Sequence, residues 1–335
     1  MAFLVSLVPI CELGSNLNGA SSEMEFHGKN LVCALGGIEG GYSLDTDMNY
    51  EILQSFAKDH HCNIEIIAAR DAASYTDSLK AGKVDLVVLP AEMEAEGLSL
   101  SKPVNGHSVW AVKDGNGCRI KNLNRWISYY ENSDEYANLQ SKYARSYNPH
   151  TRAEKGIVSK TASPYDALLK KYAGELGWDW RMLAAVAYQE SKFAIGTRSS
   201  RGAVGLMQVM PSTGKVYGVD NLLDPENNIM AGTRHLLRLQ NMMKKQGLEG
   251  EELVKFTLAA YNAGEGRILD CRNFAASRNL DNSKWEEIVS VIPLMREDSI
   301  LSEESVKLGK FKGTETIAYV DSVMALYHDI CATVM

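Results

Sequence analysis

The sequence lacks any run of about eighteen consecutive apolar residues, which is the length that a membrane-spanning helix requires. Its opening segment, MAFLVSLVPIC, is apolar, but it has no basic n-region and is short for a signal-peptide core with a cleavage site. The Val8-Pro9-Ile10 triplet before Cys11 also fits a lipoprotein signal poorly. Gly, Ser and Asn are frequent from 12 to 28, so we interpret residues 1–28 as a leader or flexible segment.

The sequence also lacks a surplus of positive charge. It has 35 Lys and Arg against 42 Asp and Glu, which gives a formal net charge of −7. Proteins that bind nucleic acids need clustered cations to displace the counterions of the phosphates. A nucleic-acid partner is therefore not expected.

Cysteine is scarce, and its spacing is uninformative about metals. The six cysteines form no CxxC pair, so neither a zinc site nor a thioredoxin-type motif is predicted. His60, His61 and Cys62 are adjacent, but neighbouring side chains do not converge on one ion, and no metal or other cofactor is expected. Cys271 and Cys331 both fall in the C-terminal domain and form the candidate disulfide, with buried free thiols as the equal alternative.

The chain of 335 residues is long enough for two domains. Its first half alternates strand and helix patterns, which predicts a parallel sheet with crossover helices. We expect strands at 31–36, 63–69, 84–90 and 107–113, and helices at 45–60 and 72–82. A helical stretch rich in Trp and Tyr follows at 123–147. The loop GGIEGGYS after the first strand is a strand-to-helix turn that could also cradle an anion.

The second half of the chain reads as helical throughout. Residues 148–162 are polar, are broken by Pro149 and Gly156, and are interpreted as a linker. Helices are expected at about 164–176, 180–192, 212–217, 226–246, 251–263, 283–290 and 314–332. No strand-like alternation of any length occurs there, which predicts a compact all-α domain.

A glutamate occupies an unusual place in this half. Asp179 can cap a helix in which Leu183, Val186, Ala187 and Glu190 share one face. That face is apolar except for Glu190, so its carboxylate is poorly solvated and its pKa should be raised, as a general acid at neutral pH requires. A buried ion pair or the edge of a solvated face would give the same pattern.

Three motifs in a fixed order extend this interpretation. ES at 190–191, GLMQ at 205–208 and AYN at 260–262 resemble the soluble lytic transglycosylase family, which cleaves peptidoglycan. The flanking stretches GWDWRMLAAVAYQESKF, DPENNIMAGTRHLLRL and ETIAYVDSV agree, and the resemblance covers about 163–330. It implies a lysozyme-like helical catalytic domain at 163–335.

The first half has a resemblance of its own. Residues 29–147 resemble the first lobe of periplasmic amino-acid-binding proteins, and the order of the two domains is similar to that of membrane-bound transglycosylases of type F. The second lobe is missing, because the chain passes from Asp114-Gly115-Asn116-Gly117 straight into the helical stretch. The predicted fold is a small three-layer α/β lobe, truncated, followed by the lysozyme-like domain. A docking or regulatory role is favoured for the lobe over ligand binding.

The resemblance implies an activity with one carboxyl group. Glu190 would protonate the glycosidic oxygen between N-acetylmuramic acid and N-acetylglucosamine. It would then take the proton of the muramic C6 hydroxyl, which attacks C1 and leaves a 1,6-anhydro end without water. The implied substrate-binding residues are Ser191, Gly205, Leu206, Met207, Gln208, Tyr261, Asn262 and Tyr319. In this scheme Gln208 donates to substrate, Tyr261 hydrogen-bonds near Glu190, and Tyr319 closes the groove.

Other functions stay open at this point. A lysozyme-type hydrolase of the same fold would need a second carboxylate and a water. An inactive cell-wall-binding protein and a solute sensor are the remaining alternatives. The implied partner is the peptidoglycan glycan strand. The substrate implies a periplasmic location, and peripheral or lipid-anchored association with the outer membrane is compatible with it. The sequence does not define the oligomeric state.

Overall fold

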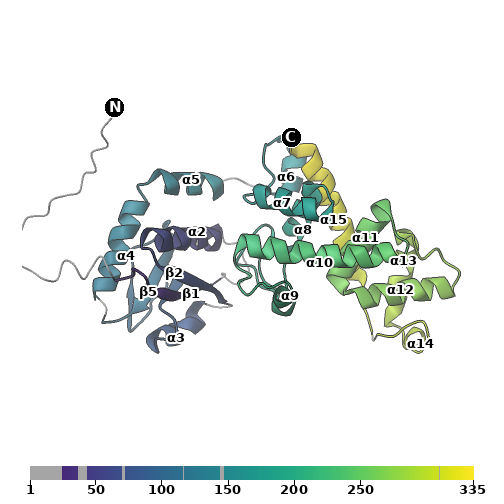
Figure 1. The fold of residues 1–335 in the computed structure, drawn as a ribbon, viewed down its shortest axis with the longest axis horizontal. Coiled ribbons are helices and arrows are strands. Elements are labelled where there is room, and N and C mark those ends of the chain that lie inside the picture. The colour runs from purple at the N-terminus through teal and green to yellow at the C-terminus, as the bar shows by residue number, and fades with distance from the viewer. Residues whose placement is uncertain (1–24, 37–43, 70–71, 116, 144–146, 309) are drawn as a thin grey trace, which may run out of the picture.

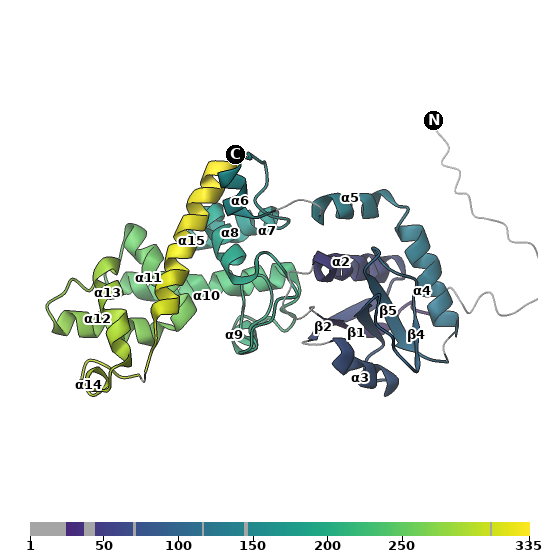
Figure 2. The ribbon, with the colours of Figure 1, turned by 180° about the vertical axis from the view of Figure 1, so that it is seen from behind.

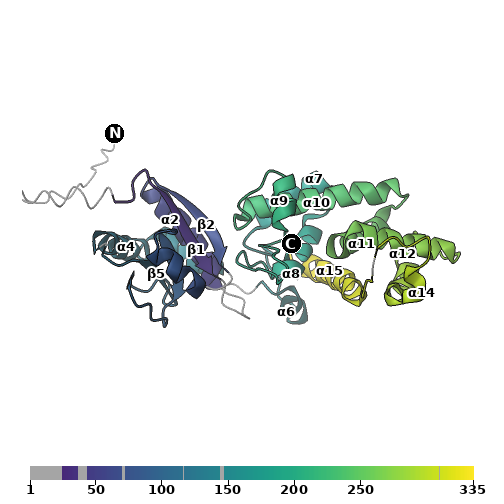
Figure 3. The same cartoon turned by 90° about the horizontal axis from the view of Figure 1, so that it is seen from below.

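The computed structural model describes residues 25–36, 44–69, 72–115, 117–143, 147–308 and 310–335. The predictions for residues 1–24 and for the glycine-rich loop at 37–43 lie outside these ranges. Figures 1 and 3 show a sheet-containing body formed by the first part of the chain, beside a helical body formed by the rest.

The first body is built on a five-stranded sheet with the order β2-β1-β3-β5-β4. Its strands are β1 (Asn30–Gly36), β2 (Asn63–Ala69), β3 (Leu86–Pro90), β4 (Leu98–Leu100) and β5 (Ser108–Lys113). β1 pairs in parallel with β2 and β3, as predicted. β5 pairs antiparallel with β3, and β4, which was not predicted, pairs antiparallel with β5. The sheet is therefore mixed rather than parallel.

Helices cover both faces of this sheet. The covering elements are α2 (Leu44–Asp59), η1 (Ala72–Tyr75), α3 (Thr76–Lys80), α4 (Gly117–Tyr130) and α5 (Asp134–Tyr143). Val87 and Leu89 belong to an apolar cluster with Leu79 of α3, whereas Leu86 and Val88 face the other way. This alternation is the period-two pattern of a strand buried on both faces.

Aromatic rings fill the larger of the two layers. Phe56 of α2 meets the rings of Trp110 and Trp126 edge-on, and the two indoles stack 5.9 Å apart. Aromatic pairs of this geometry stabilise beyond their buried area. The Trp/Tyr-rich stretch that follows the last strand is thus the outer wall of this core.

The second body consists of helices. They are α6 (Pro149–Glu154), α7 (Asp166–Leu176), α8 (Trp180–Ser191), α9 (Pro211–Val216), α10 (Pro225–Lys245), α11 (Gly250–Ala263), α12 (Glu265–Ser277), α13 (Trp285–Val291), η2 (Ile292–Arg296), α14 (Asp298–Leu301) and α15 (Thr314–Thr333). The predicted helices are confirmed to within a few residues, whereas α12, η2 and α14 were not predicted. The expected linker at 148–162 contains α6, and Ser159 bridges to Val334 at the end of α15.

Helix α8 packs against α7 and α15, and Figure 2 shows it beside α15. Asp179 caps its start, accepting a hydrogen bond from the Arg181 N–H at 2.9 Å, as predicted. Residues 182–188 are all buried. The helix ends where Lys192 takes a left-handed conformation at φ 57°, so Glu190 and Ser191 lie in its last turn.

The candidate disulfide is wrong. Cys271 and Cys331 are both free thiols. Cys271 is buried in α12, whereas Cys331 lies near the C-terminal end of α15, and Figure 1 shows these two segments well apart. Within the described ranges, no helix is long and apolar enough to span a membrane.

Candidate active site

Glu190 lies in the last turn of α8 with its side chain only partly exposed. Burial raises the pKa of this carboxyl group from 4.5 to about 7, against the opposing effects of the Tyr319 hydrogen bond and the Lys192 charge. Burial raises a carboxyl pKa because the charged form loses its hydration. At neutral pH a substantial fraction of Glu190 therefore carries a proton that it can donate.

Tyr319 is the direct partner of Glu190. It lies one turn into α15, and its hydroxyl donates to Glu190 Oε1 at 2.6 Å. Because Oε1 accepts this hydrogen bond, a proton on the carboxyl group is placed on the other oxygen, Oε2. The Tyr319 side chain is 6% exposed, so the pair is held in a fixed orientation.

The loop that carries GLMQ is held by a buried asparagine of α10. Asn228 accepts from the Met207 N–H at 2.8 Å and donates to the carbonyls of Val204 and Leu222, both at 2.8 Å. Gly205 adopts φ +78°, and a Cβ there would lie 2.2 Å from Asn228 Nδ2. Only glycine fits this close approach of backbone to side chain. Asn228 lies in the flanking stretch DPENNIMAGTRHLLRL, but this role was not predicted for it.

Ser191 and Met207 tie the loop to α8 and α10. The Ser191 hydroxyl donates to the Leu206 carbonyl at 2.9 Å, and Leu206 and Met207 are both buried. Gly232 of α10 faces Met207, since a Cβ at Gly232 would lie 2.7 Å from its sulfur. Ser191, Leu206 and Met207, which were all predicted as site residues, therefore hold the loop against α8 and α10.

Gln208 uses its amide group within the protein. Its Nε2 donates to the carbonyls of Thr197 at 3.0 Å and Gly205 at 2.9 Å, so both amide hydrogens are engaged. In this conformation Gln208 can offer a ligand only its oxygen. Its backbone lies in the left-handed region at φ 48°.

The AYN motif ends α11 beside the same loop. The Tyr261 hydroxyl donates to the Met207 carbonyl at 2.7 Å. Burial, and after it the nearby Glu190 charge, raises the pKa of Tyr261. Asn262 Oδ1 accepts from the hydroxyl of Thr316, in the first turn of α15, at 2.8 Å. Tyr261 thus makes its hydrogen bond near Glu190, whereas the hydroxyl that binds the Glu190 carboxyl group directly is that of Tyr319. Thr316 belongs to the ETIAYVDSV stretch that supports the resemblance, but its hydrogen bond to Asn262 was not predicted.

Asp179 does not provide a second acid. It caps the opposite end of the helix, about 16 Å from Glu190 at 1.5 Å rise per residue, and it is hydrogen-bonded to Arg181 and Tyr327. Asp224 caps α10 by accepting from the Asn227 N–H at 2.8 Å. No second carboxylate is among the described groups that shift the pKa of Glu190.

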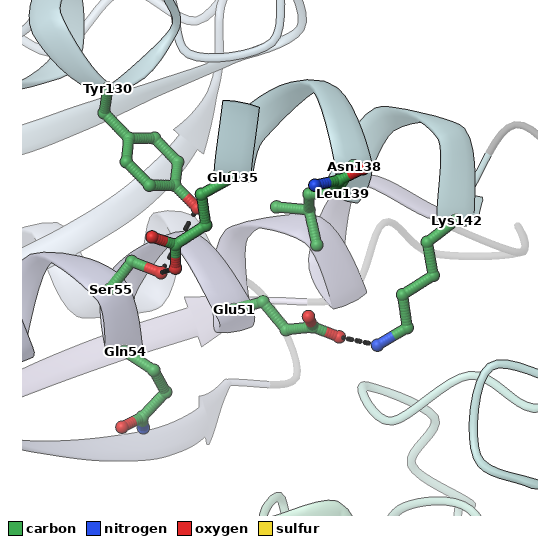
Figure 4. Close-up of a pocket in the computed structure, with 8 residues that line it drawn as sticks. All are labelled: Glu51, Gln54, Ser55, Tyr130, Glu135, Asn138, Leu139 and Lys142. Carbon is green, nitrogen blue, oxygen red and sulfur yellow. Dashed lines mark hydrogen bonds and ion pairs between the residues drawn. The ribbon is translucent and has the colours of Figure 1, made fainter. Parts of the chain in front are cut away.

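A hollow of about 330 Å³ in the first body is an alternative candidate for a ligand site. It lies between α2, the end of α4 and α5 (Figure 4). Its polar groups bind one another: Ser55 donates to Glu135, Tyr130 donates to Ser55, and Lys142 pairs with Glu51 at 2.6 Å. Because these groups are already hydrogen-bonded or ion-paired to one another, they offer a solute few free donors and acceptors. Within the described ranges, no set of three or more His, Cys, Asp or Glu residues is arranged to hold a metal.

Comparison with known proteins places this site in a family context. Residues 167–285 match the family model of the transglycosylase SLT domain. The chain is 32% identical over 241 residues to the membrane-bound lytic murein transglycosylase F of Shewanella halifaxensis, covering 69% of this chain and 48% of that protein. It is 35% identical over 177 residues to the protein of the same description from Shewanella loihica, covering 53% and 36%.

The chain thus spans about half the length, or less, of the curated relatives that it matches. Among solved structures, the 70 kDa soluble lytic transglycosylase of Escherichia coli aligns with a TM-score of 0.38 at 23% identity, over 63% of this chain and 34% of that one.

Proposed function

We propose that this chain, whose residues 167–285 are a transglycosylase SLT domain, is a lytic transglycosylase that cleaves the β-1,4 bond between N-acetylmuramic acid and N-acetylglucosamine in peptidoglycan. The observation that carries the proposal is the partly buried Glu190. Its pKa is near 7, and Tyr319 holds one of its oxygens. The relatives that share this stretch are named lytic murein transglycosylases.

Glu190 performs both proton transfers in the proposed reaction. Its protonated Oε2 gives the proton to the glycosidic oxygen as the bond to C1 breaks. The resulting carboxylate then takes the proton of the muramic C6 hydroxyl, whose oxygen forms a new bond to C1. The products are a free 4-hydroxyl on the leaving sugar and a 1,6-anhydro ring, and Glu190 is protonated again.

A single carboxyl group is sufficient for this route because the substrate supplies the nucleophile. Hydrolysis would instead need a second carboxylate about 5–9.5 Å away, to act as nucleophile or to activate water. Asp179 lies too far along α8 and is engaged by Arg181. This supports transglycosylation over a lysozyme-type reaction.

The other predicted residues support the acid and the sugar-binding surface. Ser191, Gly205, Leu206 and Met207 fix the loop next to Glu190, and the Gln208 oxygen and Asn262 face the substrate. Tyr261 holds the Met207 carbonyl, and Tyr319 orients Glu190.

We also propose the domain division that the sequence indicates. A solute-binding-like lobe at 29–147 precedes a lysozyme-like catalytic domain at 163–335, with 148–162 between them and 1–28 ahead. The substrate is the glycan strand of the periplasm. The proposed association is with the outer membrane, and the naming of the relatives as membrane-bound supports association with a membrane. The self-satisfied polar groups of the α2–α5 hollow support docking or regulation as the role of the lobe.

Product analysis by mass spectrometry tests the reaction. The full chain and its Glu190→Gln variant are incubated with peptidoglycan sacculi. Muropeptides that end in 1,6-anhydro-muramic acid are expected from the wild type alone. Reducing ends formed by water would identify a hydrolase, and the absence of any product from folded wild type would favour a binding protein.

A further inference from the structure

Helix α2 of the sheet-containing body contacts the loop that follows Glu190. In Figures 1 and 2 one end of α2 faces the helical body. Asp47, in the first turn of α2, is buried, and its Oδ1 accepts from the Ile195 N–H at 2.9 Å. Ile195 belongs to the segment by which the chain leaves α8, just after Glu190. A residue of the lobe is therefore hydrogen-bonded to the backbone close to the proposed acid.

The backbone of this segment is strained. Lys192 and Phe193 both adopt the left-handed conformation, at φ 57° and 66°. This region costs free energy for residues other than glycine, and two such residues in succession persist only where surrounding contacts hold them. Phe193 and Ile195 are both buried, and the hydrogen bond from Ile195 to Asp47 fixes the backbone that follows. The lobe thus helps to hold a conformation that the loop would not favour on its own.

The same segment carries the acceptor that holds Gln208. Thr197 lies two residues beyond Ile195, and its carbonyl accepts from the Gly205 N–H at 2.9 Å and from Gln208 Nε2 at 3.0 Å. A shift of residues 195–197 would therefore displace the GLMQ loop and turn the Gln208 side chain. Displacements of about 1 Å at a site that positions a substrate can lower its rate of reaction up to 10²-fold.

Tyr50, about one turn further along α2, reaches the GLMQ loop by a second route. It is 4% exposed, and its hydroxyl donates to Asp224 Oδ2 at 3.2 Å. The other oxygen of Asp224 caps α10 by accepting from the Asn227 N–H. The next residue of α10 is Asn228, which accepts from the Met207 N–H. Helix α2 therefore contacts both of the segments that hold the GLMQ loop.

We propose that Asp47 and Tyr50 are positioning residues for the reaction at Glu190, and that α2 of the lobe thereby completes the active site of the helical body. Both residues act through the GLMQ loop and do not touch the substrate. The inference rests on the proposed function, because it concerns the same site. It makes the lobe a structural part of the catalytic unit, a role for which the lobe needs no ligand of its own.

The test measures release of anhydro-muropeptides from sacculi by the full chain and its variants. Asp47→Ala removes the acceptor of the Ile195 N–H, whereas Asp47→Asn keeps one. Tyr50→Phe removes the hydroxyl that binds Asp224. Phe56→Leu is the matched control, because Phe56 lies in the lobe core of the same helix, edge-on to the Trp110 and Trp126 rings, and its loss lowers stability through packing alone. Thermal unfolding checks that each variant is folded.

We expect Asp47→Ala to lower kcat/KM roughly tenfold to thirtyfold and Tyr50→Phe roughly fivefold, because both loosen the GLMQ loop. Asp47→Asn and Phe56→Leu should stay within about threefold of the wild type, since the acceptor or the loop contacts remain.

A double-mutant cycle with Gln208→Ala separates positioning from a general loss of structure. If Asp47 acts through the loop that carries Gln208, then Asp47→Ala should add less than about threefold to the loss of Gln208→Ala. The two losses would multiply if the residues acted independently. Should Asp47→Ala not fold, the same cycle with Tyr50→Phe decides.

Three results would overturn the inference while leaving the proposed function in place. One is wild-type kcat/KM in folded Asp47→Ala and Tyr50→Phe. The second is a loss in Phe56→Leu as large as that in Asp47→Ala, which would assign the effect to the stability of the lobe. The third is full multiplication of the losses in the cycle. Absence of product from the folded wild type would instead reject the proposed function itself.

Discussion

Two carboxyl groups in the described part of the chain have strongly raised pKa values, and they differ in what surrounds them. Burial raises the pKa of Glu190 to about 7 and that of Asp47, in α2, to about 8. Glu190 remains partly exposed, whereas Asp47 is 3% exposed. Desolvation is the main cause for both, so it cannot by itself distinguish an acid that reacts from one that does not.

The hydrogen-bond partners make the distinction. Asp47 reaches from the sheet-containing body into the helical one, where Oδ1 accepts from the Ile195 N–H at 2.9 Å and Oδ2 accepts from the Tyr165 hydroxyl at 3.4 Å. Both oxygens are therefore engaged by the protein. Among the described residues, Tyr319 alone hydrogen-bonds to the Glu190 carboxyl group, through one of its oxygens. The comparison teaches that an acid needs a free oxygen as well as a raised pKa.

The largest expected effect is on turnover, which substitution of Glu190 should reduce far more than substitution of Asp47. Glu190→Gln removes the only proposed proton donor and should lower turnover of sacculi by a factor of about 10² to 10⁴. Asp47→Asn keeps the acceptor for Ile195 and should retain turnover within about threefold. Release of anhydro-muropeptides measures both. Equal losses for the two variants would show that Asp47 matters to the reaction and would break the comparison.

Stability should depend on pH through the same two groups. Both folded pKa values lie above the unfolded ones, from 3.8 to about 8 for Asp47 and from 4.5 to about 7 for Glu190. Folding therefore favours the protonated forms, and the free energy of unfolding should fall by several kcal/mol as the pH rises from about 4 to 8.

Urea unfolding of the full chain at pH 5 and pH 8 measures this slope. Asp47→Asn should flatten it, and Asp47→Asn/Glu190→Gln should flatten it further. Wild-type stability that is the same at both pH values would contradict the raised pKa values.

Tyr319 should set the upper pH limit of activity. Its hydrogen bond lowers the pKa of Glu190 against the effect of burial, so Tyr319→Phe should raise that pKa and move the alkaline limb of kcat/KM to higher pH. Loss of a hydrogen bond to an ionisable group should also lower turnover roughly tenfold.

Tyr261→Phe is the matched control for this change. Tyr261 donates to the Met207 carbonyl rather than to Glu190, so its loss should leave the alkaline limb in place. A limb that moves with Tyr261 and not with Tyr319 would reverse the assignment of the two tyrosines.

The parts of the fold that the sequence predicts are those set by helix capping and by the spacing of apolar residues. The Asp179 cap and the apolar stripe of α8 follow from residue spacing alone, and the structure has both. The antiparallel entry of β5 depends on how the chain returns to the sheet, which spacing does not encode.

Helix α12 escaped prediction because its buried side includes charged residues. Asp270 accepts from the Leu308 N–H at 2.7 Å, and Arg272 donates to the Asn282 carbonyl at 2.8 Å. Buried charges with such partners erase the apolar period that marks a helix.

The candidate site likewise contains residues that sequence spacing predicts and residues whose roles depend on how the helices pack. Glu190 stands out because it interrupts an apolar face. The roles of Tyr261, Tyr319 and Asn228 depend on where α10, α11 and α15 bring them, so spacing could name the tyrosines but could not assign their partners.

The smallest expected effect tests the enclosure of Asp47. Its neighbour Thr46 lies against Gly196, where an added Cβ would be 2.4 Å from Thr46 Cγ2. Gly196→Ala should therefore push α2 away from the loop after α8 and lower the free energy of unfolding by about 1–2 kcal/mol. Thr46→Ser removes Cγ2, so the double variant should recover most of the loss in urea unfolding. A double variant no more stable than Gly196→Ala would show that this close approach does not hold Asp47 in its enclosed position.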